Sequence, residues 1–144
     1  MNSEDEELRK ILDKKFRELA HEVLSRDKGK KRSLGGLIFE ANDNDFNEKV
    51  IKRSKETPVI VDFWAEWCAP CLMLAPILES VVKEFNGSVL LAKVNVDRNP
   101  ILTSKFGIMS IPTVAMFKDG KLVDYFIGVI PPEAVRRWIK RNLT

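Results

Sequence analysis

The sequence predicts an α/β protein with a central mixed β-sheet of about five strands and helices on both of its faces. Between residues 37 and 144, short apolar runs typical of strands alternate with amphipathic stretches typical of helices. An Asp-Gly pair joins the last two strand-like runs, which is a strong signal for a β-hairpin. The chain has 144 residues, enough for one domain with a single core, and its 44% hydrophobic and 31% charged residues are the balance of a folded globular protein.

The N-terminal part of the chain carries a different pattern. In residues 4–25 apolar side chains recur at helical spacing and charges fill the other face, which predicts an amphipathic helix. Residues 26–36 are rich in lysine, arginine and glycine and are expected to form a basic linker. We therefore divide the chain into an N-terminal helix with its linker (1–36) and an α/β domain (37–144).

The elements of the α/β domain are predicted from apolar runs and helix-start signals. Strands are expected at residues 37–39, 59–63, 89–96, 113–117 and 122–127. Helices are expected at residues 43–55, 70–86, 98–106 and 132–141. The first of these helices would begin at Asp43 or Asp45, and the last at Pro132. Strand 59–63 is apolar at nearly every position, which is typical of a central strand covered on both faces.

Charge and hydropathy argue against nucleic-acid and membrane partners. The net charge is only +3, and the one dense basic run, Lys28–Arg32, is interpreted as part of a solvated linker. No apolar stretch approaches the ~18 residues of a membrane span, and the acidic first residues do not resemble the basic leader of a signal peptide. We therefore expect a cytoplasmic protein, in which a disulfide is usually catalytic or transient.

The two cysteines, Cys68 and Cys71, stand three residues apart at the expected start of helix 70–86. Residues at this spacing lie on one helix face, close enough to form a disulfide after a small adjustment. A structural disulfide is the simpler interpretation, but closing a four-residue loop is worth only about 2 kcal/mol, against about 3 kcal/mol for 15 residues. The pair is therefore a poor structural link and is better suited to a redox switch.

Zinc binding is the other interpretation of such a pair. A structural zinc site needs four ligands and this pair supplies two. The only histidine, His21, lies in the N-terminal segment, and there is no third cysteine. We therefore expect neither a metal nor a bound cofactor.

The position of each cysteine suggests its role. At the first position of a helix, unpaired backbone N–H groups and the helix dipole favour a thiolate, so Cys68 is expected to be the nucleophile. Cys71, one turn further along, is expected to be the resolving thiol. Pro70 suits the first helical turn, where its missing N–H is not needed.

Asp62 interrupts the apolar strand 59–63 and has two interpretations. A buried carboxylate would have a raised pKa and could accept a proton near neutral pH. Alternatively, Asp62 would be an acid on an edge strand that faces water. The spacing favours neither interpretation. Lys93, alone in an apolar run, is the residue that could pair with it.

Taken together, the motifs of residues 37–144 resemble the thioredoxin family, over about three quarters of the chain. The matching motifs are Val61–Cys71, Ala75-Pro76, Lys93–Asp97, Ile111–Thr113, Gly120 and Gly128. A Cys-x-x-Cys motif alone would be a weak signal, whereas this ordered set is specific. The chain departs from the family pattern in carrying Ala69 where glycine is usual and Leu72 where lysine is frequent.

The resemblance implies a thioredoxin fold and a role for each matching residue. Cys68 would attack the substrate and Cys71 would resolve the intermediate. Asp62 would be a buried acid that helps to deprotonate Cys71, with Lys93 nearby. Pro112 would be a cis-proline that faces the disulfide.

The resemblance also implies a flat apolar rim that meets partner proteins. Its residues would be Trp67, Ala69, Pro70, Ile111, Gly128 and Val129. Ile111 would offer backbone hydrogen bonds to a substrate strand, and the Ala69-Pro70 dipeptide would tune the redox potential. Without the resemblance, ordinary packing would be the simpler interpretation of Trp67, Gly128 and Val129.

The function implied is that of a protein-disulfide reductase, a general cytoplasmic electron donor in cell redox homeostasis. Its partners would be disulfide-containing proteins and a thioredoxin reductase or similar electron donor. One alternative is a disulfide oxidase or isomerase. Another is a binding module whose N-terminal helix recruits a partner or dimerises through Leu12, Phe16, Leu19 and Val23. We expect a monomer.

Overall fold

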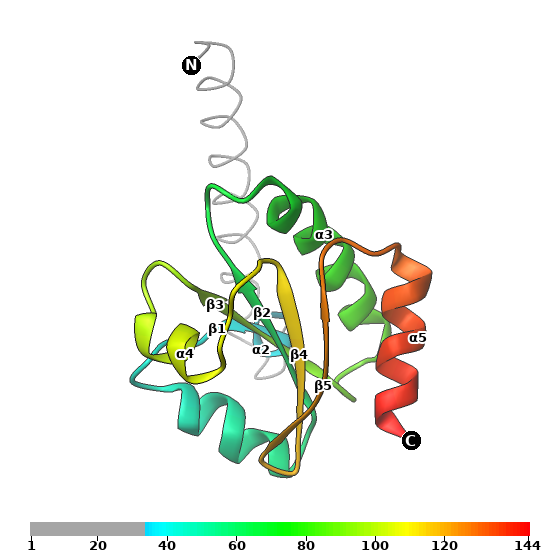
Figure 1. Cartoon of the computed structure of the whole chain (residues 1–144). Coiled ribbons are helices and arrows are strands. Elements are labelled where there is room, and N and C mark those ends of the chain that lie inside the picture. Colours follow the sequence, from blue (N-terminus) through cyan, green and yellow to red (C-terminus); the bar gives the residue numbers. More distant parts are fainter. Residues whose placement is uncertain (1–33) are drawn as a thin grey trace. The chain divides into compact units, whose positions relative to one another are not determined.

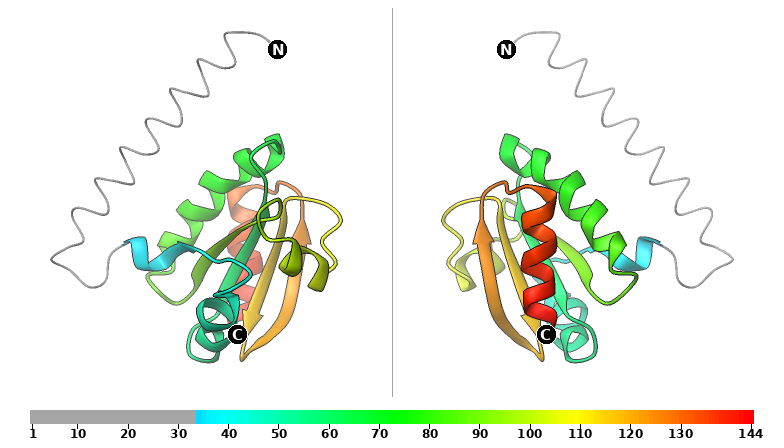
Figure 2. Two further views of the ribbon diagram at one scale, coloured as in Figure 1. Left: turned by 90° about the vertical axis from the view of Figure 1, so that its left-hand side faces the viewer. Right: turned by 90° about the vertical axis from the view of Figure 1, so that its right-hand side faces the viewer.

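The computed structural model describes residues 34–144. The predicted helix 4–25, His21, the basic run Lys28–Arg32 and most of linker 26–36 lie outside the described residues. Within the described part, a central sheet separates helices α3 (Ala69–Glu84) and α5 (Pro132–Leu143) on one side from α4 (Pro100–Lys105) on the other (Figure 1 and Figure 2). This three-layer arrangement confirms the predicted fold class.

The observed elements follow the prediction closely. The five strands are β1 (Ile38–Glu40), β2 (Val59–Trp64), β3 (Leu90–Asn95), β4 (Thr113–Lys118) and β5 (Lys121–Ile127). Besides α3, α4 and α5, the chain forms a single turn α2 (Leu34–Leu37), a π-helical segment η2 (Asn47–Lys52) and a 3₁₀ turn η3 (Arg53–Lys55). The regular helix expected at 43–55 is thus shorter and irregular, and it begins after Asp45.

The order of the strands across the sheet is β1-β3-β2-β4-β5. The pairs β1–β3 and β2–β3 are parallel, whereas β2–β4 and β4–β5 are antiparallel, so the sheet is mixed as predicted. β2 lies at the centre and its residues Val59–Phe63 are all buried. The reactive cysteines follow directly after this central strand.

The hairpin between β4 and β5 forms at the predicted Asp-Gly pair. Asp119 has φ 53° and Gly120 has φ 80°, both in the left-handed region. A tight two-residue hairpin turn requires positive φ at both central positions, and aspartate followed by glycine adopts it at low cost. The local sequence therefore determines the register next to the turn, and the register then shifts between Met116 and Phe117.

Asp43 has a different role from the one predicted. Its carboxylate oxygens accept hydrogen bonds from the backbone N–H groups of Ile101 (3.3 Å) and Leu102 (2.9 Å), in the first turn of α4. Of the two predicted helix starts, Asp43 is wrong and Asp45 is right in position, because helical structure begins directly after Asp45 and the Asp45 carbonyl oxygen accepts the Lys49 N–H at 2.9 Å. Asp43 caps α4, a helix more than fifty residues further along the chain.

Candidate active site

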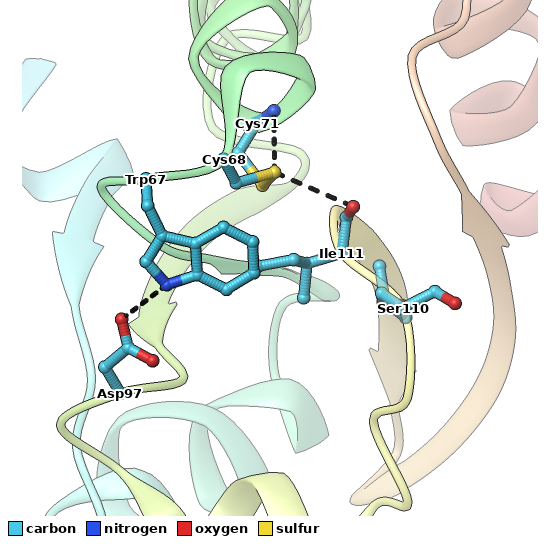
Figure 3. The surroundings of a disulfide bond; sticks show 7 residues. Trp67, Cys68, Cys71, Asp97, Ser110 and Ile111 are labelled. Carbon is cyan, nitrogen blue, oxygen red and sulfur yellow. Dashed lines mark hydrogen bonds between the residues drawn. A yellow bond between two sulfur atoms is a disulfide. The ribbon is translucent and has the colours of Figure 1, made fainter. Parts of the chain in front are cut away.

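The two cysteines are joined by a disulfide at the N-terminus of α3 (Figure 3). Cys68 is the residue that caps the helix, in an extended conformation, and Ala69 and Pro70 are its first two helical residues. The backbone N–H of Cys71 donates a hydrogen bond to Cys68 Sγ at 3.3 Å. Because the helix begins here, this N–H has no partner within the helix and is directed at the Cys68 sulfur.

Both cysteines are largely buried, in contact with Ala65 and with the partly buried side chains of Trp64, Val96 and Ile111. Cys68 keeps 5% of its surface exposed and Cys71 keeps 1%. An attacking partner therefore has access to the Cys68 side of the disulfide first.

The segment Ile111–Thr113 faces the disulfide from the start of β4. The Ile111–Pro112 peptide bond is cis, as the resemblance implied. The Ile111 carbonyl oxygen lies 3.7 Å from Cys68 Sγ, and Figure 3 shows it pointing at that sulfur. The Gly128 backbone N–H donates to the Pro112 carbonyl at 2.9 Å, which places the segment after β5 beside the same loop.

Trp67, directly before Cys68, is exposed, and its indole Nε1 donates a hydrogen bond to Asp97 Oδ2 at 2.9 Å (Figure 3). This bond holds the indole of a residue that would otherwise be free to rotate. Asp97 belongs to the motif Lys93–Asp97, but the sequence did not identify it as a site residue. The bond joins positions 30 residues apart, and no local pattern predicts it.

Asp62 is buried on central strand β2, so the interpretation of an edge acid facing water is wrong. Burial raises its pKa to about 6, with a smaller increase from Glu79 on α3 and an opposing effect of Lys93. No residue of the described part donates a hydrogen bond to either carboxylate oxygen. An unpaired buried carboxylate titrating near neutral pH is suited to accept and release a proton.

Lys93 stands beside Asp62, since the two residues are partners in the parallel register of β2 and β3. Its ammonium nitrogen lies 5.5 Å from the centre of the Trp64 ring. It also lines a cavity of about 460 Å³ with both polar and apolar walls. Lys93 is thus near the buried acid and also near solvent.

Among residues 34–144, no group of three or more histidine, cysteine, aspartate or glutamate side chains could hold a metal ion. Within the same part of the chain, no helix is long and apolar enough to cross a membrane.

A cysteine pair at a helix start, facing a cis-proline and following a central strand that carries a buried acid, defines a thiol–disulfide oxidoreductase. A model of the thioredoxin family matches residues 37–141. The thioredoxin of Rickettsia bellii is 46% identical over 107 residues, which cover 74% of this chain and 100% of that protein. The thioredoxin of Chlorobaculum thiosulfatiphilum is 40% identical over 108 residues, 75% of this chain and 98% of that protein. The chain belongs to the thioredoxin family.

A plant protein extends this similarity. The chloroplastic M-type thioredoxin of Pisum sativum is 44% identical over 102 residues, 71% of this chain and 58% of that protein. Family and cysteine pair together make this protein a thiol–disulfide oxidoreductase, and they support protein-disulfide reduction as its activity. Members of the family generally work with a thioredoxin reductase and with disulfide substrates.

Proposed function

We propose that the protein is a general electron donor that reduces protein disulfides, with Cys68 as the attacking thiol and Cys71 as the resolving thiol. The observation that carries this assignment is the hydrogen bond from the Cys71 N–H to Cys68 Sγ at the start of α3. Hydrogen-bond donors and the positive end of the helix dipole stabilise a thiolate, and in the reduced protein they would favour one at Cys68 over one at Cys71.

The proposed reaction transfers two electrons from the dithiol to the substrate. The Cys68 thiolate attacks one sulfur of a substrate disulfide, the substrate S–S bond breaks, and the second substrate sulfur leaves as a thiolate. Cys71 then loses its proton and attacks Cys68 Sγ. The mixed disulfide breaks, the substrate leaves fully reduced, and Cys68 and Cys71 are joined as an oxidised pair.

Asp62 is the proposed acceptor of the Cys71 proton. Its support is a buried carboxylate on β2 with a pKa of about 6, which is close to neutrality. Lys93, its neighbour on β3, lowers that pKa and so keeps part of the Asp62 population ionised near neutrality.

The surface around Cys68 is the proposed contact with substrates. Exposed Trp67 and Val129 lie on it with Gly128, and the backbone of Ile111 and Pro112 faces the sulfur. A substrate strand paired with Ile111 would present its sulfur to Cys68. Ala69 and Pro70, both exposed between the cysteines, would set the redox potential through the first helical turn.

The cellular setting follows from the direction of the reaction. A protein that donates electrons must be reduced again, which we assign to a thioredoxin reductase or similar donor in the cytoplasm, where thiols are kept reduced. We propose that residues 37–144 carry the activity as one domain, without nucleic acid, membrane or bound cofactor, and that the protein works as a monomer.

The midpoint potential of the Cys68/Cys71 pair, measured against a glutathione or dithiothreitol buffer, tests the direction. A reductase is expected near the family value of about −270 mV. A value near about −180 or −120 mV, as in an isomerase or an oxidase, would instead support the alternative function.

A further inference from the structure

β5 presents apolar side chains that nothing in the described part of the chain covers. It is one of the two edge strands of the sheet, and on one face Phe126 packs against Trp138 of α5 with ring centroids 4.9 Å apart. On the other face Leu122, Tyr125 and Ile127 are 45%, 58% and 55% exposed. Apolar residues on an exposed sheet face usually mark a contact surface.

These three side chains form one wall of a groove. The groove has a volume of about 360 Å³, and Phe106 and Phe117 lie at its base. Its opposite wall is the segment 107–110 between α4 and β4, where Met109 is almost fully exposed. None of the residues that line the groove carries a charge. Most of the lining is apolar, which favours an apolar occupant.

The groove is continuous with the disulfide site. Ser110 and Thr113 line it, and the cis bond Ile111–Pro112 lies between them. Thr113 pairs with Ile127 in the sheet register, so the groove begins beside the residues that face Cys68. Figure 3 shows Ser110 next to Ile111 on this loop.

From these observations we propose that the groove, defined by Met109, Leu122, Tyr125 and Ile127, binds an extended apolar segment of the disulfide substrate. The inference rests on the proposed reduction of protein disulfides and adds a substrate class to it. From Ile127 to Leu122 the strand rises roughly 16 Å, at about 3.3 Å per residue. A substrate chain leaving the disulfide would thus place alternate side chains in the groove over about six residues.

The consequence is selectivity among protein substrates. Burying one or two apolar side chains in an open groove is expected to raise kcat/KM by about tenfold over a polar sequence with the same disulfide. Substrates whose disulfide is flanked by apolar, extended sequence would be reduced first.

The test measures how efficiently the full-length protein reduces each of two synthetic disulfide peptides. One carries leucine at the second, fourth and sixth positions on both sides of the reacting cysteine, and the other carries serine there. Wild type is expected to favour the leucine peptide by about tenfold in kcat/KM, and the variant Leu122→Ser/Tyr125→Ser by less than about twofold. The matched control is Val123→Ser, on the same strand with its side chain 49% exposed but outside the groove, and it should keep the wild-type ratio.

Each other outcome counts against the proposal. Equal reduction of both peptides by wild type, or equal loss of selectivity in Val123→Ser, overturns the groove while leaving the reductase function intact. Failure to reduce either peptide overturns the proposed function and the groove with it. Light scattering that finds a dimer in wild type and a monomer in Leu122→Ser/Tyr125→Ser would assign the face to a second copy of the chain instead.

Discussion

Asp62 and Lys93 are direct partners in the parallel register of β2 and β3, yet no hydrogen bond joins the ammonium group to the carboxylate. The Lys93 nitrogen lies over the Trp64 ring, 5.5 Å from its centre. Lys93 therefore lowers the pKa of Asp62 through space. Burial has the larger effect in the opposite direction, so the pKa of Asp62 is about 6.

Asp62→Asn is expected to stabilise the fold at neutral pH. The pKa of Asp62 rises from 3.8 to about 6 on folding, so the folded protein holds this proton more tightly than the unfolded chain does. Wild type therefore loses stability as pH rises from about 4 through about 6, by about 3 kcal/mol in all. The asparagine variant has no such loss, so its advantage in chemical denaturation should be full at pH 7.5 and absent below about pH 4.

The same variant tests the proposed proton transfer. Asp62→Asn should slow insulin reduction near neutral pH by about 100-fold or more, because Cys71 loses its proton acceptor. Rates equal to wild type across pH 6–8, in a variant with the expected stability gain, would remove Asp62 from the mechanism.

Lys93 and Glu79 act on Asp62 with opposite sign. Lys93→Gln should move the pH at which the reduction rate is half-maximal upward, since the ammonium lowers the pKa of Asp62, and Glu79→Gln should move it downward. Lys105→Gln is the matched control, because Lys105 also lies over an aromatic ring, Phe106 at 5.7 Å, and exerts no effect on Asp62. A shift of the same size in the control would show that loss of any lysine moves the profile.

The sequence predicted features of the fold that depend on neighbouring residues, but not those that depend on contacts between distant residues. The Asp119-Gly120 turn and the buried strand 59–63 were predicted because each depends on local backbone preference or continuous apolarity. The capping of α4 by Asp43 could not be predicted, because it joins residues brought together only by the packed sheet.

The features of the candidate site fall into the same two groups. The helix-start position of Cys68 follows from local sequence, and the cis bond before Pro112 from the family motif. The partner of Trp67, the influence of Glu79 and the exposed groove beside β5 depend on tertiary placement. A period-2 strand pattern would place Leu122 on the face opposite Tyr125 and Ile127, and it does not reveal the register shift between Met116 and Phe117 that accompanies their shared position in the groove. Nor does such a pattern show whether another element covers a face.

Asp43→Ala should weaken the fold through the loss of the α4 cap. Removal of a capping carboxylate costs about 1 kcal/mol, so the free energy of unfolding should fall by about that amount. Glu48→Ala is the control, since it removes only the exposed pair with Lys52 and should cost about 0.3 kcal/mol. Urea denaturation measures both, and a smaller loss for Asp43→Ala than for Glu48→Ala would contradict the capping role.

The two cysteines should differ in reactivity once the disulfide is reduced. Cys68→Ser is expected to abolish turnover, whereas Cys71→Ser should form mixed disulfides with substrates that cannot resolve. Iodoacetamide titration should modify Cys68 at a lower pH than Cys71, because only Cys68 Sγ accepts the N–H at the start of α3. Faster alkylation of Cys71 would reverse the two roles.

Residues 1–36 are expected to be dispensable for the chemistry. Every residue placed at the disulfide lies within 37–144, and the family match begins at residue 37. Insulin reduction by the fragment 37–144 should therefore equal that of the full chain within about twofold, while the melting temperature of the fragment measures any contribution of the first 36 residues to stability. Circular dichroism shows whether the fragment is folded. If the folded fragment reduces insulin at least tenfold more slowly than the full chain, the N-terminal segment belongs to the active machinery and the division at residue 37 is refuted. If the fragment is faster, the segment competes with substrates for the Cys68 surface.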